Sequence, residues 1–301
     1  MRKKGIQLLI VLFAVVLVLS LLSVKIVSVE GKAMYPGLSD GQKIVVHSIK
    51  SPWNQLAKLF SKDDSYPLKR FQLIAFRPPQ LNDIPLPKRD LIIRRLIAFP
   101  GEEVLIEPNE VRIDNQAIPE PAEVIYPFRI VGNQKLSEEI LNHPLLHFPT
   151  WIAAPGFYNA HLAPIHRDSL IQLPEIDQIR EIREPSKQSA QRNFPKSYYI
   201  QWNQSFFGPV VIPKKNQTVT LNEQNIDLYR RIIEVYEGND LEITSNKEFV
   251  IQGITTRYYT FRQNYYFVLN DFRDEFGDSR TWGFLPEDHI VGFRTLRTVE
   301  R

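Results

Sequence analysis

The sequence predicts a mainly β protein built from antiparallel strands, with few short helices, behind one N-terminal hydrophobic segment. Short apolar, β-branched or aromatic runs follow one another from residue 43 onward. Many of them alternate polar and apolar residues, as strands with one buried face do. The 22 prolines stand mostly between these runs, which favours a loop-rich β body. Examples of the runs are "KIVV" (43–46), "FQLIAF" (71–76), "EVLI" (103–106) and "YYFVL" (265–269).

The N-terminal segment predicts a transmembrane helix. Residues 6–24 are apolar except for Gln7 and two serines. A run of about 20 apolar residues is long enough to cross a bilayer core of roughly 30 Å. A cleaved signal peptide is the alternative, but its apolar stretch usually has about 7–15 residues and ends at a small-x-small site. Residues 24–27 offer no such site, so we expect a retained anchor over residues 6–27.

The basic residues around this segment predict its orientation. Arg2, Lys3 and Lys4 precede it, whereas Lys25 and Lys32 follow it more sparsely. Positive charge favours the cytoplasmic side, so we expect the N-terminus in the cytoplasm. The expected location is the inner or plasma membrane, with a single pass, membrane lipid as a partner and the body on the extracytoplasmic (periplasmic) side.

A second apolar patch lies close to the anchor in "PWNQLAKLF" (52–60). Trp53, Leu56, Leu59 and Phe60 have the character of interfacial residues that dip into the outer leaflet of a membrane. The same side chains also suit a cover over the β core. The sequence leaves both interpretations open.

The composition excludes several classes of function. The 37 basic residues are matched by 34 acidic ones, and the net charge of +3 is too small to indicate a nucleic-acid partner. Cysteine is absent, which excludes disulfides, thiolate metal sites and a cysteine nucleophile. The six histidines show no metal-ligand spacing backed by carboxylates, so we expect neither a metal nor another cofactor.

One amphipathic helix is expected over about residues 224–237. Leu228, Ile232 and Tyr236 share one helix face, and Gly238 stands where a C-terminal cap belongs. The stretch from 116 to 200 is the least informative, and residues 172–193 are expected to form an exposed loop or insertion. The expected organisation is a basic cytoplasmic N-terminus (1–5), an anchor (6–27), the first part of the core (28–115), an inserted second β region with a loop-rich middle (116–265) and a final core motif (266–301).

Three segments carry motifs with chemical meaning. They are "VEGKAMYPGLSDGQKIVV" (29–46), "LIIRRLIAFPGEEVLIEPNEVRID" (91–114) and "YYFVLNDFRDEFGDSRTWGFLPEDHIVG" (265–292). In this order and spacing they resemble the bacterial type I signal peptidases, the S26 family of membrane-anchored serine endopeptidases that process signal peptides during protein secretion. The resemblance implies an antiparallel body of the signal-peptidase type with two β regions.

The resemblance also implies a Ser–Lys dyad, whose chemistry has clear requirements. A serine hydroxyl needs a base that takes its proton. A lysine serves as that base only if burial lowers its pKa enough to leave it neutral near pH 7. In this sequence the nucleophile position is Ala33, the base position is Arg94, and the position of the serine that orients the lysine is Phe276. None of these three side chains can do its required task, so no catalytic residue is intact.

The frame around these positions matches better. Asp278 and Arg280 are expected to form a buried ion pair that fixes their loop, and Gly101 is expected to serve a tight turn. Structural roles are expected for Arg95, Pro100, Gly101, Asp278, Ser279, Arg280 and Gly283. Other matches are Met34, Pro36, Leu38, Arg273, Asp274 and Trp282, and departures from the family pattern are Gln42, Gln72, Glu102, Asn270 and Phe272.

The leading hypothesis is a pseudoenzyme that binds signal peptides, exported proteins or another extended polypeptide at the membrane surface. Its cleft is expected to be lined by Lys32, Ala33, Met34 and Pro36, and an active signal peptidase paralogue is a further candidate partner. An active signal peptidase with unconventional residues, such as Lys32 and Ser39, is one alternative. A membrane assembly or scaffold factor is another.

Overall fold

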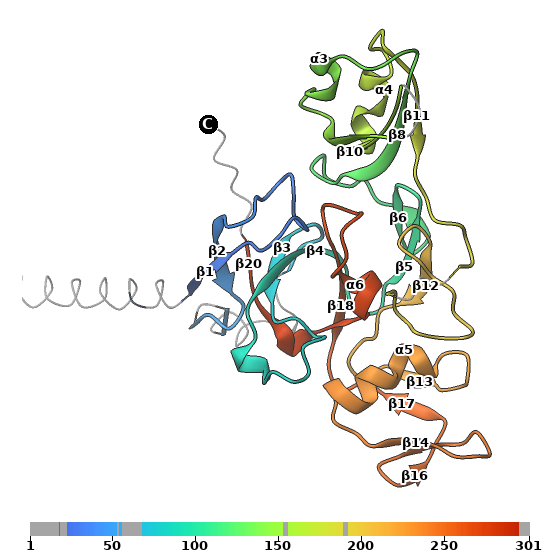
Figure 1. The fold of residues 1–301 in the computed structure, drawn as a ribbon. Helices are drawn as coiled ribbons and strands as arrows, with labels where there is room; N and C mark the ends of the chain where they lie inside the picture. Colours follow the sequence, from blue (N-terminus) through green and yellow to red (C-terminus); the bar gives the residue numbers. More distant parts are fainter. Residues whose placement is uncertain are drawn as a thin grey trace, which may run out of the picture.

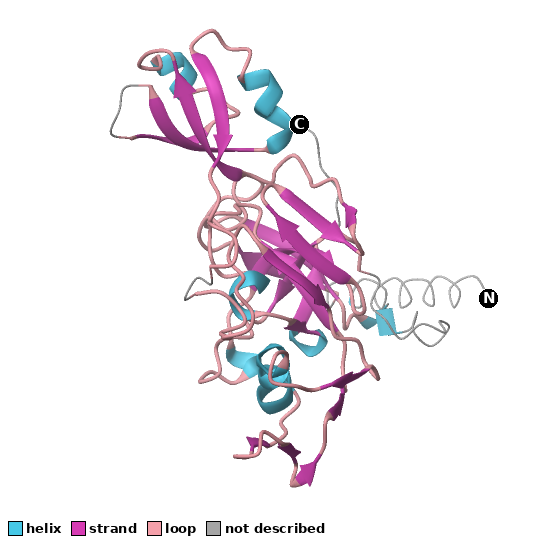
Figure 2. Ribbon diagram, turned by 90° about the vertical axis from the view of Figure 1, so that its right-hand side faces the viewer, coloured by secondary structure: helices cyan, strands magenta, loops and turns pink. Residues whose placement is uncertain are grey.

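The computed structural model describes residues 18, 23–52, 54–55, 68–152, 156–188 and 192–294. The body is elongated, with a large sheet in the middle, a smaller sheet with the two short helices α3 and α4 (called the third sheet below) at one end, and a small helical region at the other end (Figure 1). Figure 2 shows the same three parts from the side. All paired strands are antiparallel and the helices are few and short, so the predicted mainly β class is confirmed for the body.

The central sheet has seven strands in the order β1-β2-β20-β3-β4-β18-β19. Successive side chains of a strand point to opposite faces, and both faces are buried at β3. Leu73 and Ala75 join one hydrophobic cluster, whereas Ile74 and Phe76 join another. The strands are β1 (Val24–Ser28), β2 (Lys43–Ser48), β3 (Leu73–Phe76), β4 (Ile92–Ala98), β18 (Tyr265–Leu269), β19 (Leu285–Pro286) and β20 (Ile290–Phe293).

Strand β1 corrects the predicted anchor at its C-terminal end. Residues 24–27 were expected to finish a helix, but they pair with β2 from Val24 opposite His47 to Ser28 opposite Lys43. Valine and isoleucine have stiff, branched side chains that suit a strand at least as well as an apolar helix. The other residues of the expected anchor, except Val18 and Ser23, lie outside the described residues, as do Trp53 and residues 56–60 of the second apolar patch.

The described helices can be compared with the length and hydrophobicity that a membrane span requires. Within the described ranges, no helix combines the length and the apolar character that crossing a bilayer requires.

A second sheet and a helical region pack together beside β18. Helix α5 (Ile226–Arg231) continues into the π-helical turn η3 (Ile232–Tyr236), and Gly238 follows with φ of +63°, so the helix predicted over 224–237 is confirmed. Leu228 and Ile232 are buried in the shared core. The second sheet, in the order β12-β5-β6-β7, has β5 (Glu103–Glu107), β6 (Glu110–Ile113), β7 (Gln116–Ala117) and β12 (Phe207–Val211). The helical region adds β13 (Thr218–Thr220), β14 (Leu241–Ile243), β15 (Phe249–Ile251), β16 (Ile254–Thr255) and β17 (Tyr258–Thr260).

The third sheet, in the order β11-β8-β10-β9, occupies the stretch that the sequence left open. Residues 172–193 were expected to form an exposed loop, but they contain β11, whose Ile176 and Ile179 are buried. A register shift between Ile176 and Gln178 brings both isoleucines to the same face, and this irregularity hides the period of two in the sequence. The sheet has β8 (Tyr126–Gly132), β9 (His147–Trp151), β10 (Phe157–Leu162) and β11 (Ile176–Glu181), and α3 (Glu138–Leu141), η2 (Pro164–His166) and α4 (Arg167–Leu170) accompany it.

Three further short helical turns lie in the described chain. They are η1 (Leu86–Lys88), α6 (Ser279–Trp282) and η4 (Glu287–His289).

Candidate functional site

The loop between β18 and α6 brings together the segments that carry the three reactive positions. The backbone N–H of Phe272 in this loop donates to the carbonyl of Ala33, at 3.0 Å. At the other end of the loop, Arg94 Nε on β4 donates to the carbonyl of Gly277, at 3.1 Å. Phe276 precedes this glycine. The structure therefore places all three segments around one loop.

Arg94 is a buried cation that donates hydrogen bonds from Nε and Nη1. Its side chain is 9% exposed, and Nη1 donates to the carbonyl of Ile93 at 2.7 Å. Burial lowers the pKa of Arg94 to about 10, although the nearby carboxylates, first among them Asp278, oppose this shift. A pKa of about 10 lies about three units above neutral pH, so only about one guanidinium in 1,000 is neutral. Arg94 therefore cannot accept a proton as a base.

The positions around Ala33 differ in their exposure. Ala33 is 6% exposed, and Met34 is buried in the core cluster that β1 and β2 share with β4. Lys32 is exposed, with its ammonium 4.8 Å from the centre of the Phe148 ring, and Pro36 is half-buried. The surface in this region thus consists of Lys32 and Pro36 rather than of the methyl group at position 33.

Phe276 is at the surface, where its ring faces Arg192. Its side chain is 40% exposed, and the guanidinium of Arg192 lies 5.2 Å from the ring centre. A phenyl ring offers neither a donor nor an acceptor, so it cannot hold an amine in place.

Two buried arginines anchor the loop after β18. Arg95 joins it to the central sheet, and Arg273 joins it to the segment that leads into the third sheet. Arg95 donates from Nε and Nη2 to both oxygens of Asp271, at 2.5 Å each. Asp271 is an aspartate whose importance the motifs did not reveal. Arg273 pairs with Glu120 and also contacts the Tyr126 hydroxyl. Tyr126 begins β8 of the third sheet, and Glu120 lies in the segment that leads into this strand.

The expected ion pair between Asp278 and Arg280 is present. Arg280 Nη2 donates to Asp278 Oδ2 at 2.7 Å, and both side chains are almost fully buried. Asp278 also caps α6 by accepting the N–H of Arg280, and the Ser279 hydroxyl accepts the N–H of Val268 at 3.0 Å. Gly283 ends α6 with φ of +90°, where a Cβ would lie 2.8 Å from the Phe194 ring. These contacts fix the loop by shape and charge.

Pro100 and Gly101 form the turn between β4 and β5. Gly101 has φ of +93°, and its N–H donates to the carbonyl of Ile212 at 2.7 Å. A side chain is strained at that φ, so this turn favours glycine.

Strands β9 and β10 of the third sheet contact the same loop, which the sequence did not predict. His161 Nε2 lies 3.1 Å from Asp274 Oδ2, and the Phe148 ring stacks on Phe272 with centres 5.6 Å apart. The Tyr35 hydroxyl, two residues after Ala33, lies 3.2 Å from His147 Nδ1. The third sheet therefore contacts both Tyr35, close to Ala33 in sequence, and the loop after β18, which donates a hydrogen bond to Ala33.

The pKa values of Asp274 and His147 are shifted at this contact between the third sheet and the loop. The hydrogen bond with His161 lowers the pKa of Asp274, against the opposing effect of burial. Burial lowers the pKa of His147, and the positive charges of His161 and His166 lower it further. In the part of the chain that the structure describes, no group of three or more histidine, aspartate or glutamate side chains is arranged to hold a metal ion.

Comparison with known proteins identifies the family. The sequence pattern of the family described as "Signal peptidase, peptidase S26" matches residues 2–144 and 208–299, which is most of the chain. The chain belongs to this signal peptidase family. Signal peptidase I of Haemophilus influenzae is 41% identical over 64 residues, a stretch that covers 21% of this chain and only 17% of that relative. The residues between the two signal peptidase matches, 145–207, contain β9, β10 and β11.

The side chains at the two reactive positions differ in chemistry from a Ser–Lys dyad. A signal peptidase frame surrounds Ala33, but the described site offers a methyl group and a protonated guanidinium at the two reactive positions. The histidine contacts come from strands outside the family match, which explains why family motifs gave no signal for them.

Proposed function

We propose that this chain is a membrane-anchored, non-catalytic signal peptidase homologue that binds signal peptides or other extended polypeptides. One observation carries the proposal. Arg94, at the base position, is a buried cation held by the carbonyls of Gly277 and Ile93, while Ala33 replaces the nucleophile. Acyl transfer needs a hydroxyl to attack and a neutral base to take its proton, and this pair supplies neither.

The free edge of β1 supports a binding mode. Among the described strands, β1 pairs with β2 alone, so its other edge keeps backbone groups available. Strand β4 also has an edge without a paired strand at its start, because β18 pairs with it only from Arg95 onward, and there the Arg94 side chain occupies the carbonyl of Ile93. Side chains of both strands, Val27 and Ile93, lie in one hydrophobic cluster. An extended peptide that adds to these edges gains main-chain hydrogen bonds without any need for a dyad.

The alternative dyad of Lys32 and Ser39 has no support in the geometry. Both residues are exposed, and the Lys32 ammonium lies over the Phe148 ring. An exposed amine lacks the burial that a neutral lysine base requires. We therefore place an active peptidase second to the binding function.

The proposed setting is a membrane. The apolar residues 6–24 and the basic residues at positions 2–4 support a single-pass anchor with the N-terminus in the cytoplasm and the body on the periplasmic side. An active signal peptidase paralogue or the secretion machinery is then a suitable neighbour for a protein that captures exported chains.

The test combines a cleavage assay with crosslinking. Full-length protein in detergent is incubated, in molar excess, with a secretory precursor of known cleavage site. We expect no cleavage, and we expect a photocrosslinker at position 26 on the β1 edge to capture the precursor. A matched crosslinker at exposed position 254, on β16, serves as the control and should capture none.

Each possible failure of this test has its own meaning. Precursor cleavage that Lys32→Ala or Ser39→Ala abolishes would establish an active peptidase. Absence of capture at position 26 would favour the scaffold hypothesis.

A further inference from the structure

The third sheet has one face that its helices do not cover. Ile130 and Ile179 on the covered face belong to the core cluster with helix residue Leu170. On the other face, register places Arg180 opposite Arg129, and Arg129 opposite Asn159. Two guanidinium groups therefore stand side by side on adjacent strands.

These two arginines lack an acidic partner. Arg129 Nε donates to Asn159 Oδ1 at 3.3 Å, and Arg180 Nε donates to Gln178 Oε1 at 2.7 Å, so both partners are neutral. No ion pair joins either guanidinium to a carboxylate among the residues that the structure describes. Like charges directly opposite each other on a sheet destabilise it. A bound anion would remove this repulsion.

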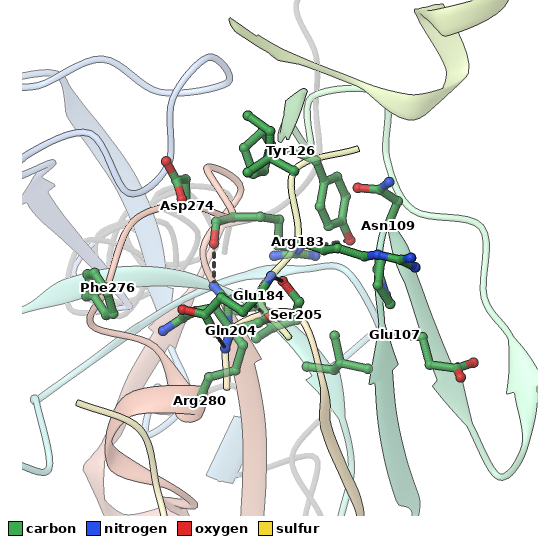
Figure 3. Close-up of a pocket in the computed structure, with 16 residues that line it drawn as sticks. Glu107, Asn109, Tyr126, Arg183, Glu184, Gln204, Ser205, Asp274, Phe276 and Arg280 are labelled. Atoms are coloured by element: carbon green, nitrogen blue, oxygen red, sulfur yellow. Dashed lines mark hydrogen bonds between the residues drawn. The ribbon is translucent and has the colours of Figure 1, made fainter. Parts of the chain in front are cut away.

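The same face leads into a cavity at the junction with the second sheet and the loop after β18. Pro127 and Ile182, two residues along β8 and the β11 chain from the arginines, line this cavity, whose volume is about 170 Å³. Arg183 also lines it, and Figure 3 shows it among the lining residues with Glu184 and Asn109. Arg183 has no ion pair with any described residue.

Each of the three carboxylates that line the cavity already has a hydrogen-bond or ion-pair partner among the described residues. This matters because free carboxylates would repel an anion. Glu107 pairs with Arg112 at 3.2 Å, Glu184 accepts the N–H of Gln204 at 2.9 Å, and Asp274 contacts His161.

Two amide groups in the lining have unused hydrogen-bonding capacity. Asn109 Nδ2 and Gln204 Oε1 are buried and have no partner. Gln204 Nε2 donates to Asn193 Oδ1, and Asn193 Nδ2 is also unpartnered, so rotating both amides only changes which atom of Gln204 is free. Buried polar groups without a partner are costly, and a ligand with peptide-like donors and acceptors would satisfy them.

We propose that this arginine groove, formed by Arg129, Arg180, Arg183, Asn109 and Gln204, binds an acidic segment of a polypeptide. Carboxylate side chains of the segment sit on the guanidinium groups, and its backbone amides meet Asn109 and Gln204. A flat anionic surface fits less well, because it cannot reach the buried amide groups of Asn109 and Gln204 inside the cavity. The groove is separate from the β1 edge, so the two sites stand or fall independently.

The test measures fluorescence anisotropy of full-length protein in neutral detergent with a labelled 12-residue peptide of alternating glutamate and serine. A peptide of alternating glutamine and serine is the reference. We expect binding of the glutamate peptide to be at least about 10-fold tighter, and to weaken about 10-fold in Arg129→Gln/Arg180→Gln, because two charge-assisted contacts are lost. The matched control Arg167→Gln/Arg257→Gln removes the same charge at exposed positions elsewhere and should bind like the parent.

A neutral variant keeps the test decisive if the arginine pair alters folding. Asn109→Gly changes no charge and suits the left-handed backbone of residue 109 (φ of +59°), so it should weaken glutamate-peptide binding about threefold with an unchanged thermal midpoint. Equal affinity for the two peptides, or equal loss in the matched control, would overturn the proposal. A third outcome would also overturn it: inorganic phosphate or vesicles of phosphatidylglycerol displace the labelled peptide, and the glutamate and glutamine peptides bind equally well. The groove would then be a general anion site.

Discussion

His161 Nε2 on β10 lies 3.1 Å from Asp274 Oδ2 in the loop after β18, across 113 residues of sequence. The same loop donates a backbone hydrogen bond to Ala33 and accepts one from Arg94. The third sheet is thus connected directly to the segment around which the former reactive positions lie.

Removing this histidine contact should loosen the third sheet without unfolding the chain. We expect a coupling free energy of about 0.2–1 kcal/mol between His161→Ala and Asp274→Asn, because the Asp274 side chain is 58% exposed and solvent screens the pair. Urea unfolding of both single variants and the double variant measures the coupling. Hydrogen exchange of β9 and β10 should accelerate in each variant, and unchanged exchange would contradict a holding role for this contact.

Acidification should weaken the same region through His147. Burial and two neighbouring histidines lower its pKa in the folded state below the ordinary value of about 6.5. As the pH falls, His147 therefore binds a proton in the unfolded state before it does so in the folded state. The contribution of His147 to the free energy of unfolding is complete above about pH 6.5. It falls as the pH drops toward the folded-state pKa and then levels off. Unfolding midpoints between pH 7.5 and 5 should fall less steeply in His147→Gln than in the parent. An equal slope in both proteins would show that His147 is not responsible.

The ion pair of Asp278 and Arg280 should be far more sensitive than an exposed pair. Asp278→Asn leaves a buried guanidinium without its charge partner, which costs about 3–5 kcal/mol in comparable buried pairs. The exposed pair of Glu223 and Lys247 provides the control, and Glu223→Gln should leave the unfolding midpoint nearly unchanged. Similar midpoints for the two variants would mean that the buried pair does not fix the fold.

Restoring single reactive groups should not restore proteolysis. Ala33→Ser alone supplies a hydroxyl without a base, since Arg94 stays protonated at neutral pH. Arg94→Lys alone supplies an amine without a nucleophile. We expect precursor cleavage, followed by gel electrophoresis, to stay at background in both and to rise only when Ala33→Ser, Arg94→Lys and Phe276→Ser are combined. Activity in either single variant would refute this account of the site.

Local patterns predicted the parts of the fold that depend on near neighbours. In β2, exposed and buried residues alternate without a break from Lys43 to Ser48, so its period of two could be read directly. Helix α5 with η3 was predictable because Leu228 and Ile232 recur at helical spacing. The residue types at positions 33 and 94 are read from the sequence alone, and the prediction that they cannot form a dyad awaits the cleavage assay.

Contacts between distant segments were not predictable in the same way. Register decides that His161 meets Asp274 and that Arg129 stands opposite Arg180, and no local pattern encodes register between separate strands. The strand at Val24–Ser28 was missed because its branched apolar residues also suit the end of a membrane span. The motifs named Asp274 and Arg273, but only the structure shows which partners hold them.

The short parallel bridge between Ile125 and Phe272 constrains how this protein can be shortened. Ile125 donates its N–H to Asp271 at 2.9 Å and accepts the N–H of Arg273 at 3.0 Å, just before the chain enters the third sheet. A shortened variant without that sheet must keep Ile125. Otherwise the loop segment 271–273, which donates a hydrogen bond to Ala33, loses two backbone hydrogen bonds. The hydrogen bonds of Ile125 therefore join the start of the third sheet to the loop beside Ala33, and a shortened variant should be cut after Ile125.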